Sequence, residues 1–353
     1  MERKNLRRVN KSNVEQHGLE PLEPLRLKEI RSFDQLLEQM KETALGARDI
    51  GNALNVLSSM VRDPDCKIVL TLSGVVTVAK LGGIIAEMIE RDLISCIVST
   101  GAVVCHGLSD ERGSKHYKLP KDYSDAWLFE QGYNRIFDTI ETEYAMDELD
   151  KVIKSILKDL PAEKILCSSD ITDLMGRYLL ENGCGEGFLQ MAHKKNVPIF
   201  IPAFTDSEIG FDFVLFNRYR KRKNLPEIHF DPFLDFERYY NFIINSKIPG
   251  IITLGGGVPR NWAQQICSYI DIKNRREKID VVEPKRFKYG IRICGDSTHL
   301  GGLSGSTYSE AVSWGKFVPP DEGGMLAEVH CDFTIAFPIL IKALFDRLDN
   351  RSG

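Results

Sequence analysis

Short apolar runs that alternate with helical stretches constrain the fold of this chain more than any other feature. Seven of these runs lead into glycine or short polar residues, and they lie at 67–72, 93–100, 164–167, 197–201, 250–254, 289–294 and 326–331. Apolar strands of this length, separated by helices, are typical of a parallel sheet with helices on both faces. We therefore predict an α/β fold, doubly wound and Rossmann-like, with a mostly parallel sheet.

At 353 residues the chain is long enough for one large α/β domain or two ordinary ones. Residues 1–30 are polar and contain two prolines, so we expect an N-terminal arm followed by a single domain over 31–353. Apolar residues recur at helical spacing over 33–60, with interruptions expected near Gly46 and Gly51.

Charge and cysteine usage exclude several classes of function. The net charge of −4 makes nucleic acid an unsuitable main partner, and we interpret the basic run at 218–223 as a solvated face. No apolar run is long enough to span a membrane, and no signal peptide is visible. The eight cysteines are scattered without a C-x-x-C pair, which favours free thiols in the cytoplasm over disulfides or a zinc site, and we expect no metal.

In parallel sheets of this kind, ligands bind in the crevice beyond the carboxyl ends of the strands. Glycines and short polar residues occupy those positions here, as a nucleotide crevice requires. The candidates are Ser73, Gly74, Thr77, Thr100, Gly101, Asp206, Gly255, Gly256, Gly257, Asp296 and Asp332. Five of them have a plain alternative: Asp206 and Asp332 are suited to cap helices, and the run Gly255 to Gly257 is equally suited to a tight turn. We place Thr77 in a helix predicted over 75–91.

Lys316 is the candidate catalytic residue. A lysine amine acts as a nucleophile when it is kept partly deprotonated, which burial beside an apolar ring favours. Trp314 offers such a ring and a face for an alkylammonium group, and Glu310 offers a carboxylate for a second amine. Together they indicate a site for a small polyamine. The alternative is a buried tryptophan, a turn glycine and a solvated lysine.

Four stretches carry a resemblance to a known family, and they lie at 196–206, 254–259, 310–316 and 329–332. The run from Glu310 to Lys316 resembles the active-site segment of the deoxyhypusine synthase family, and the Gly-Gly-Gly-Val-Pro run resembles another part of that site. The resemblance implies a deoxyhypusine synthase-type fold and one NAD-binding catalytic domain over 31–353. It further implies that Lys316 carries a covalent intermediate and that Asp206 and Asp332 contact NAD.

The same resemblance implies a reaction and an assembly. NAD oxidises spermidine or a similar polyamine, the lysine attacks the resulting imine, and the aminobutyl group passes to an acceptor amine before the hydride returns. It also implies a homotetramer with active sites at dimer interfaces.

Departures from the family pattern affect the substrate pocket. The family's acidic pair after a strand is replaced by Cys105 and His106, its histidine after the glycine run by Asn261, and its aspartate after Thr-Asp is displaced by one, to Asp212. We expect Asp212, Asn261 and His106 to bind substrate beside Glu310 and Trp314, with His106 otherwise a structural hydrogen-bonding group.

An ammonium buried without its carboxylate is costly, so these departures predict a retuned pocket. We favour putrescine as acceptor, which gives homospermidine. The alternatives are a protein acceptor, namely the lysine of a translation factor, and a non-catalytic homologue that binds NAD or polyamine.

Overall fold

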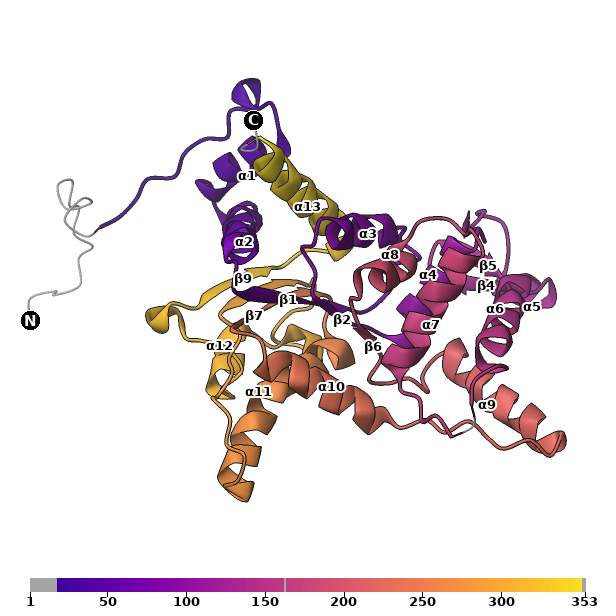
Figure 1. Ribbon diagram of the computed structural model, residues 1–353. Helices are drawn as coiled ribbons and strands as arrows, with labels where there is room; N and C mark the ends of the chain where they lie inside the picture. The colour runs from indigo at the N-terminus through magenta and orange to yellow at the C-terminus, as the bar shows by residue number, and fades with distance from the viewer. Residues whose placement is uncertain (1–17, 162, 351–353) are drawn as a thin grey trace, which may run out of the picture.

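The computed structural model describes residues 18–161 and 163–350, so most of the predicted N-terminal arm lies outside the described residues. A six-stranded, fully parallel sheet forms its centre (Figure 1). Its order is β6 (Ile199–Phe200), β2 (Cys96–Val98), β1 (Cys66–Leu72), β7 (Ile248–Leu254), β8 (Tyr289–Ile293) and β9 (Met325–Val329). The predicted α/β fold with a mostly parallel sheet is confirmed.

Helices cover both faces of this sheet (Figure 1). One face packs on α10 (Pro232–Ile244), α11 (Gly257–Glu277) and α12 (Tyr308–Ser313). The larger core on the other side of the sheet includes residues of α1 (Phe33–Lys41), α2 (Leu45–Arg62), α3 (Gly82–Glu90), α4 (Gly101–Glu111), α6 (Glu143–Leu157), α7 (Ser168–Glu181), α8 (Phe188–Lys195), α9 (Glu208–Arg222) and α13 (Phe333–Asp349). Among these helices, α2, α7 and α13 make most of the contacts with the strands. Short 3₁₀ turns lie at η2 (Leu27–Glu29), η3 (Leu303–Gly305) and η4 (Pro320–Glu322).

Six of the seven predicted strands are confirmed, and the run at 164–167 is the exception. Leu166 forms a single parallel bridge with Phe230, outside the main sheet. The run is too short to form a ladder, because Asp170 accepts a hydrogen bond from the Cys167 amide and α7 begins at once at Ser168.

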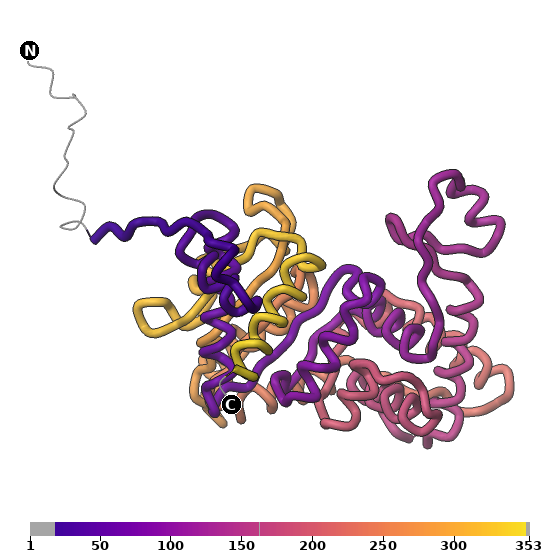
Figure 2. The backbone as a smooth tube through the Cα atoms, turned by 90° about the horizontal axis from the view of Figure 1, so that it is seen from above, coloured from indigo at the N-terminus to yellow at the C-terminus, as the bar shows by residue number. Residues whose placement is uncertain are grey.

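A small antiparallel sheet was not predicted. It contains β3 (Tyr117–Lys118), β5 (Thr139–Thr142) and β4 (Tyr133–Ile136), and it accompanies the short helix α5 (Asp125–Glu130). This segment projects at the end of the molecule far from the N-terminal helices (Figure 2). The turn between β4 and β5 contains Phe137 at φ +53° and no glycine, so it lacks the usual hairpin signature.

Two predictions about helices need correction. The chain over 33–60 is interrupted at 42–44, close to Gly46 as expected, but α2 continues unbroken through Gly51. Gly51 is buried inside α2, where an added Cβ would lie 2.6 Å from the Leu37 carbonyl oxygen, so it allows α1 and α2 to cross closely. The helix expected over 75–91 begins only at Gly82, after a series of turns.

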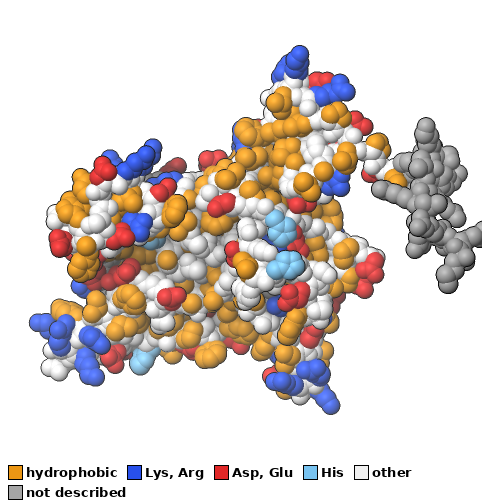
Figure 3. Space-filling model, turned by 180° about the vertical axis from the view of Figure 1, so that it is seen from behind, with side chains coloured by type: hydrophobic (Ala, Val, Ile, Leu, Met, Phe, Trp, Pro, Cys, Tyr) orange, Lys and Arg blue, Asp and Glu red, His pale blue; other side chains and the backbone are white. Residues whose placement is uncertain are grey.

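Surface charge and hydropathy agree with the composition. On the face seen in Figure 3, Lys and Arg side chains gather at projecting ends and form no continuous patch over the described residues. Within the basic run at 218–223, Arg220 is buried and its Nε donates to the Pro226 carbonyl, whereas the neighbouring basic side chains are exposed. Among the described helices, none has the length and apolar character needed to cross a membrane. All eight cysteines are free thiols.

Candidate active site

Lys316 is held in place by its own backbone. Thr307 caps α12, the helix ends at Trp314, and Gly315 takes φ +65°, a conformation that favours glycine. The Lys316 amide donates to the Ala311 carbonyl, and the Lys316 carbonyl accepts from the Phe287 amide just before β8. These bonds fix the lysine against the sheet, on the face covered by α11.

The Lys316 side chain is only 8% exposed, so the solvated alternative is wrong. Its Nζ lies 3.4 Å from Asn261 Oδ1 and 5.9 Å from the centre of the Trp314 ring. Burial lowers the pKa of Lys316 below its ordinary value, and the nearby Arg260 guanidinium lowers it further, against a smaller raising effect of Glu310. A larger share of the amine is therefore neutral, as a nucleophile requires.

A cavity of about 220 Å³ opens in front of Lys316. Its lining includes Asn261, Glu310 and Trp314, so the structure brings these predicted substrate-binding residues together with the lysine. Glu310 is exposed at the rim, where its carboxylate can meet an incoming ammonium group. A small cavity with a buried amine, an indole face and one carboxylate suits a slender, cationic ligand.

Beside this cavity lies a first group of predicted crevice residues, around Ser73. The Ser73 hydroxyl accepts from the Gly256 amide at 2.9 Å and donates to the Leu254 carbonyl at 3.1 Å. Gly255 has φ +75°, and an added Cβ there would lie 2.4 Å from Ser73 Oγ. The tight turn is therefore real, and it also presents the start of α11 at Gly257 to the crevice.

Ser304 connects this crevice to the lysine cavity. Its hydroxyl donates to Asp296, and an added Cβ on Gly256 would lie 2.6 Å from its Cα. The Ser304 carbonyl accepts from Arg292 at 2.6 Å and from Arg260, which also lines the cavity, at 3.4 Å. The group of residues around Ser73 is therefore adjacent to the cavity of Lys316.

A second group of predicted residues gathers where β2 and β6 end. Thr100 caps α4, and an added Cβ on Gly101 would lie 2.2 Å from Ser207 Oγ. Ser207 caps α9, so the alternative that Asp206 is the helix cap is wrong. Asp206 is exposed beside two helix N-termini. Within the described residues, the buried Ser99 hydroxyl at the end of β2 has no hydrogen-bond partner.

The residues that follow these strands have the chemistry that binding of a dinucleotide requires. Glycines allow close backbone approach, helix N-termini favour phosphate, and the orphaned Ser99 hydroxyl and exposed Asp206 offer hydrogen bonds to polar ligand groups. Gly74 has φ +71°. An added Cβ at this position would lie 3.5 Å from the ring of Phe333, the residue that follows Asp332. Asp332 accepts from the Thr334 amide at 2.7 Å, so its role as a helix cap is confirmed.

Three predicted residues lie away from these groups. Thr77 is buried, and its hydroxyl donates to the Val103 carbonyl at 3.0 Å, which ties the turns before α3 to α4. Asp212 is buried on α9, where burial and the nearby carboxylates of Asp150 and Glu208 raise its pKa to about 7. His106 lies on α4, 2.8 Å from Glu141. None of them lines the cavity of Lys316 within one chain.

Arg260 and Arg292 belong to the site but escaped the sequence analysis. Arg292 is 1% exposed and pairs with Glu328, whose other carboxylate oxygen accepts from the Tyr308 amide at 2.8 Å, so the pair anchors the start of α12. Arg260 adds positive charge next to Lys316. Arg260 could have been found from the sequence, because it directly precedes the predicted site residue Asn261. Arg292 could not, because it lies inside an apolar strand.

Comparison with known proteins gives concordant results. A sequence model of the deoxyhypusine synthase family matches residues 35–344. A protein of Methanosarcina acetivorans named probable deoxyhypusine synthase 2 is 32% identical over 93% of this chain and 90% of its own length. A protein of Chlorobaculum parvum named deoxyhypusine synthase-like protein is 31% identical, over 86% of this chain and 84% of its own. A crystal structure from Entamoeba histolytica, described as a deoxyhypusine synthase, has the same fold at a TM-score of 0.60 and 16% identity, over 92% of this chain and 97% of that one.

Proposed function

Because the chain belongs to the deoxyhypusine synthase family, we propose that it transfers the aminobutyl group of spermidine, or of a similar polyamine, to an acceptor amine. The observation that carries this proposal is the buried Lys316 amine, whose lowered pKa favours the neutral form. Lys316 faces a cavity that also contains Glu310 and Trp314, groups suited to the two ends of a polyamine.

We propose NAD as the cofactor, which accepts a hydride from the polyamine and returns it at the end. Ser73, the N-terminus of α11 after the glycine run and the N-terminus of α4 would hold it, with Asp206 as a further partner. Side chains of the protein then bind the substrate and carry out the transfer. Glu310 holds a terminal ammonium, and Trp314 stacks over the alkyl chain.

Lys316 provides the covalent step. Its neutral amine forms a bond to the imine carbon of the oxidised polyamine, and the bond from that carbon to the departing diamine breaks as the diamine takes up a proton. The acceptor amine next displaces Lys316 by the same addition and elimination in reverse. Asn261 Oδ1, 3.4 Å from Nζ, orients the amine between these two exchanges.

We propose putrescine as the acceptor, with homospermidine as product. Cys105 and His106 occupy the place of the family's acidic pair, and Asn261 that of its histidine, which supports a pocket retuned for a different acceptor. The cavity volume of about 220 Å³ suits a small diamine. A lysine of a translation factor is the competing acceptor.

We further propose a homotetramer located in the cytoplasm. Support for assembly is that Asp212 does not line the Lys316 cavity of its own chain, so another copy would have to complete the site if Asp212 binds substrate. The free state of all eight cysteines supports a reducing compartment. Sedimentation equilibrium tests the assembly, and a monomer at micromolar concentration would rule it out.

Mass spectrometry of the products tests the function. The protein is incubated with spermidine and NAD, with and without putrescine, and Lys316→Arg serves as the inactive control because arginine stays protonated. We expect homospermidine only when putrescine and NAD are both present. Transfer confined to a translation-factor lysine would replace the acceptor, and the absence of any transfer would leave a non-catalytic homologue.

A further inference from the structure

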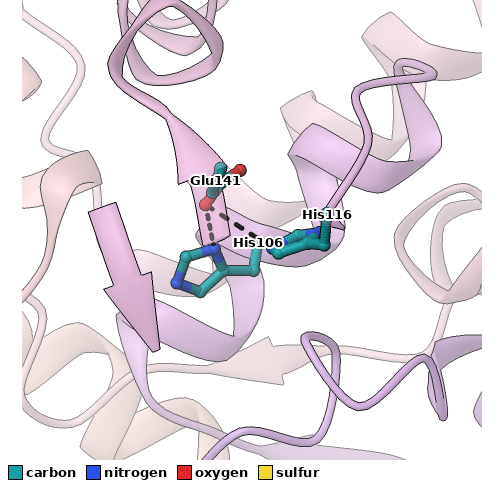
Figure 4. A group of neighbouring side chains, drawn as sticks. All are labelled: His106, His116 and Glu141. Carbon is teal, nitrogen blue, oxygen red and sulfur yellow. Dashed lines mark ion pairs between the residues drawn. The ribbon is translucent and has the colours of Figure 1, made fainter. Parts of the chain in front are cut away.

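A second cluster of reactive side chains lies apart from Lys316, at the base of the projecting small sheet (Figure 4). His106 comes from α4, His116 from the segment before β3, and Glu141 from β5. One nitrogen or oxygen atom of each lies within 4.8 Å of the others. His106 Nδ1 is 2.8 Å and His116 Nε2 is 3.5 Å from the same Glu141 oxygen, Oε2.

Hydrogen bonds do not fully account for this arrangement. His106 Nδ1 and His116 Nε2 are both buried, and neither makes a hydrogen bond of acceptable geometry despite its closeness to the carboxylate. The ring nitrogens therefore point beside the Glu141 oxygen and not directly at it. A cation between the three atoms would satisfy both nitrogens and the oxygen at once.

The surrounding residues hold the three side chains as metal ligands are usually held. His116 Nδ1 lies 3.1 Å from Asp110 Oδ1 and 2.8 Å from Lys80 Nζ, which itself pairs with Asp110, and these neighbours fix the ring so that Nε2 faces the cluster. The Ser109 hydroxyl donates to the second Glu141 oxygen at 2.9 Å, leaving Oε2 free for the cluster. A carboxylate behind a histidine and a hydrogen bond behind a ligating carboxylate are typical outer partners of metal ligands.

We propose that His106, His116 and Glu141 bind one divalent transition-metal ion, for which zinc is the best fit. Two histidines with one carboxylate form a known zinc ligand set, and its fourth position stays open to water or substrate. Bonds of about 2.1 Å in tetrahedral geometry place ligand atoms about 3.4 Å apart, so the pair at 3.5 Å already fits. The distance of 2.8 Å between His106 Nδ1 and Glu141 Oε2 has to increase by about half an ångström when the ion binds.

Access and spacing explain why the site is easily missed. The side chains of His116 and Glu141 are each 2% exposed, whereas that of His106 is 21% exposed and offers the route of entry. The three ligands are separated by ten and by twenty-five residues and include no cysteine, so no sequence pattern marks them. This proposal gives His106 a role other than the amine binding expected from the sequence, and it does not depend on the proposed reaction.

Metal titration of the full-length chain tests the proposal. The protein is stripped with a chelator, dialysed and titrated with zinc against a chromophoric competitor, and cobalt serves as a spectroscopic probe. We expect one zinc per chain, cobalt absorption typical of tetrahedral coordination, and a rise in melting temperature with zinc. Losing a ligand in His106→Ala or Glu141→Gln should weaken zinc binding by at least ~100-fold, more than the loss of an outer partner.

His193→Ala is the matched control, because His193 pairs with Asp173 elsewhere at 2.7 Å and should leave zinc binding unchanged. Circular dichroism checks that each variant is folded. If a variant does not fold, the cobalt spectrum of the unaltered chain still tests whether the metal binds. Failure of the unaltered chain to bind zinc or cobalt at one ion per chain would overturn the proposal. Equal binding by His106→Ala, Glu141→Gln and the unaltered chain would overturn it as well.

Discussion

At the scale of single residues, the reactivity of Lys316 depends on neutral and cationic neighbours. Asn261 accepts from Nζ without adding charge, and Arg260 disfavours the ammonium form. A carboxylate at position 261 would reverse this balance, because an opposite charge at hydrogen-bonding distance favours the protonated lysine.

We therefore expect Asn261→Asp to raise the pKa of Lys316 and to slow group transfer ~10–100-fold at neutral pH. Activity should recover as the pH rises toward the new value. The measurement is the pH dependence of group transfer, with Asn261→Ser as a control that removes the amide but adds no charge. An unmoved pH profile would show that Asn261 does not set the state of the lysine.

Asp212 offers a separate test at this scale, through stability. Its pKa is raised to about 7 by burial and by neighbouring carboxylates. The folded protein thus holds this proton more tightly than the unfolded chain, so its contribution to stability is present at low pH and is lost as the pH rises from about 4 to about 7.

Asp212→Asn should remove this loss. The free energy of unfolding of the variant should exceed that of the unaltered chain at pH 8, and the difference should shrink toward pH 4. Urea denaturation at several pH values measures it, and Glu227→Gln is the control, because Glu227 is an exposed carboxylate beyond the end of α9. A difference that stays constant with pH would disprove the raised pKa.

At the scale of secondary-structure elements, the meeting of α4 and α9 shapes one side of the crevice. Gly101 and Ser207 approach so closely that a Cβ on Gly101 would lie 2.2 Å from Ser207 Oγ. Gly101→Ala should destabilise the protein by ~1–3 kcal/mol, the usual cost of overpacking. Gly83→Ala is the matched control, since a Cβ there meets nothing within 4 Å.

The double variant Gly101→Ala with Ser207→Gly should recover part of the loss, because it removes the side chain that clashes. Thermal or urea denaturation of Gly101→Ala, Ser207→Gly and the double variant measures this coupling. Costs that simply add would contradict the direct contact.

The elements themselves were predictable where local sequence determines them. Apolar strands such as β1 and β7, buried on both faces, appear as apolar runs. The hairpin of β4 and β5 was not predictable in this way, because Asn134 and Arg135 are exposed and its turn lacks glycine. The second break expected near Gly51 was wrong, because this glycine allows α1 and α2 to cross closely and does not end a helix.

At the scale of the whole molecule, the candidate site was predictable only in part. Glu310, Trp314 and Lys316 are neighbours in sequence and also in the cavity. Asn261, which was expected only through the family resemblance, and Arg260 reach them from α11, about fifty residues earlier in the chain. The cluster of His106, His116 and Glu141 joins three separate segments. Contacts of this kind depend on tertiary packing, which no local pattern reports.

The proposed reaction requires a covalent intermediate at Lys316, and borohydride trapping tests for this intermediate most directly. The protein is incubated with NAD and spermidine labelled in its aminobutyl part, reduced, digested and examined by mass spectrometry. We expect the aminobutyl group on Lys316, dependent on NAD, absent in Lys316→Arg and retained in Lys288→Arg, whose ammonium pairs with Asp63 at 3.6 Å. An unlabelled Lys316 under conditions where NAD binds, or label on another lysine, would contradict the account.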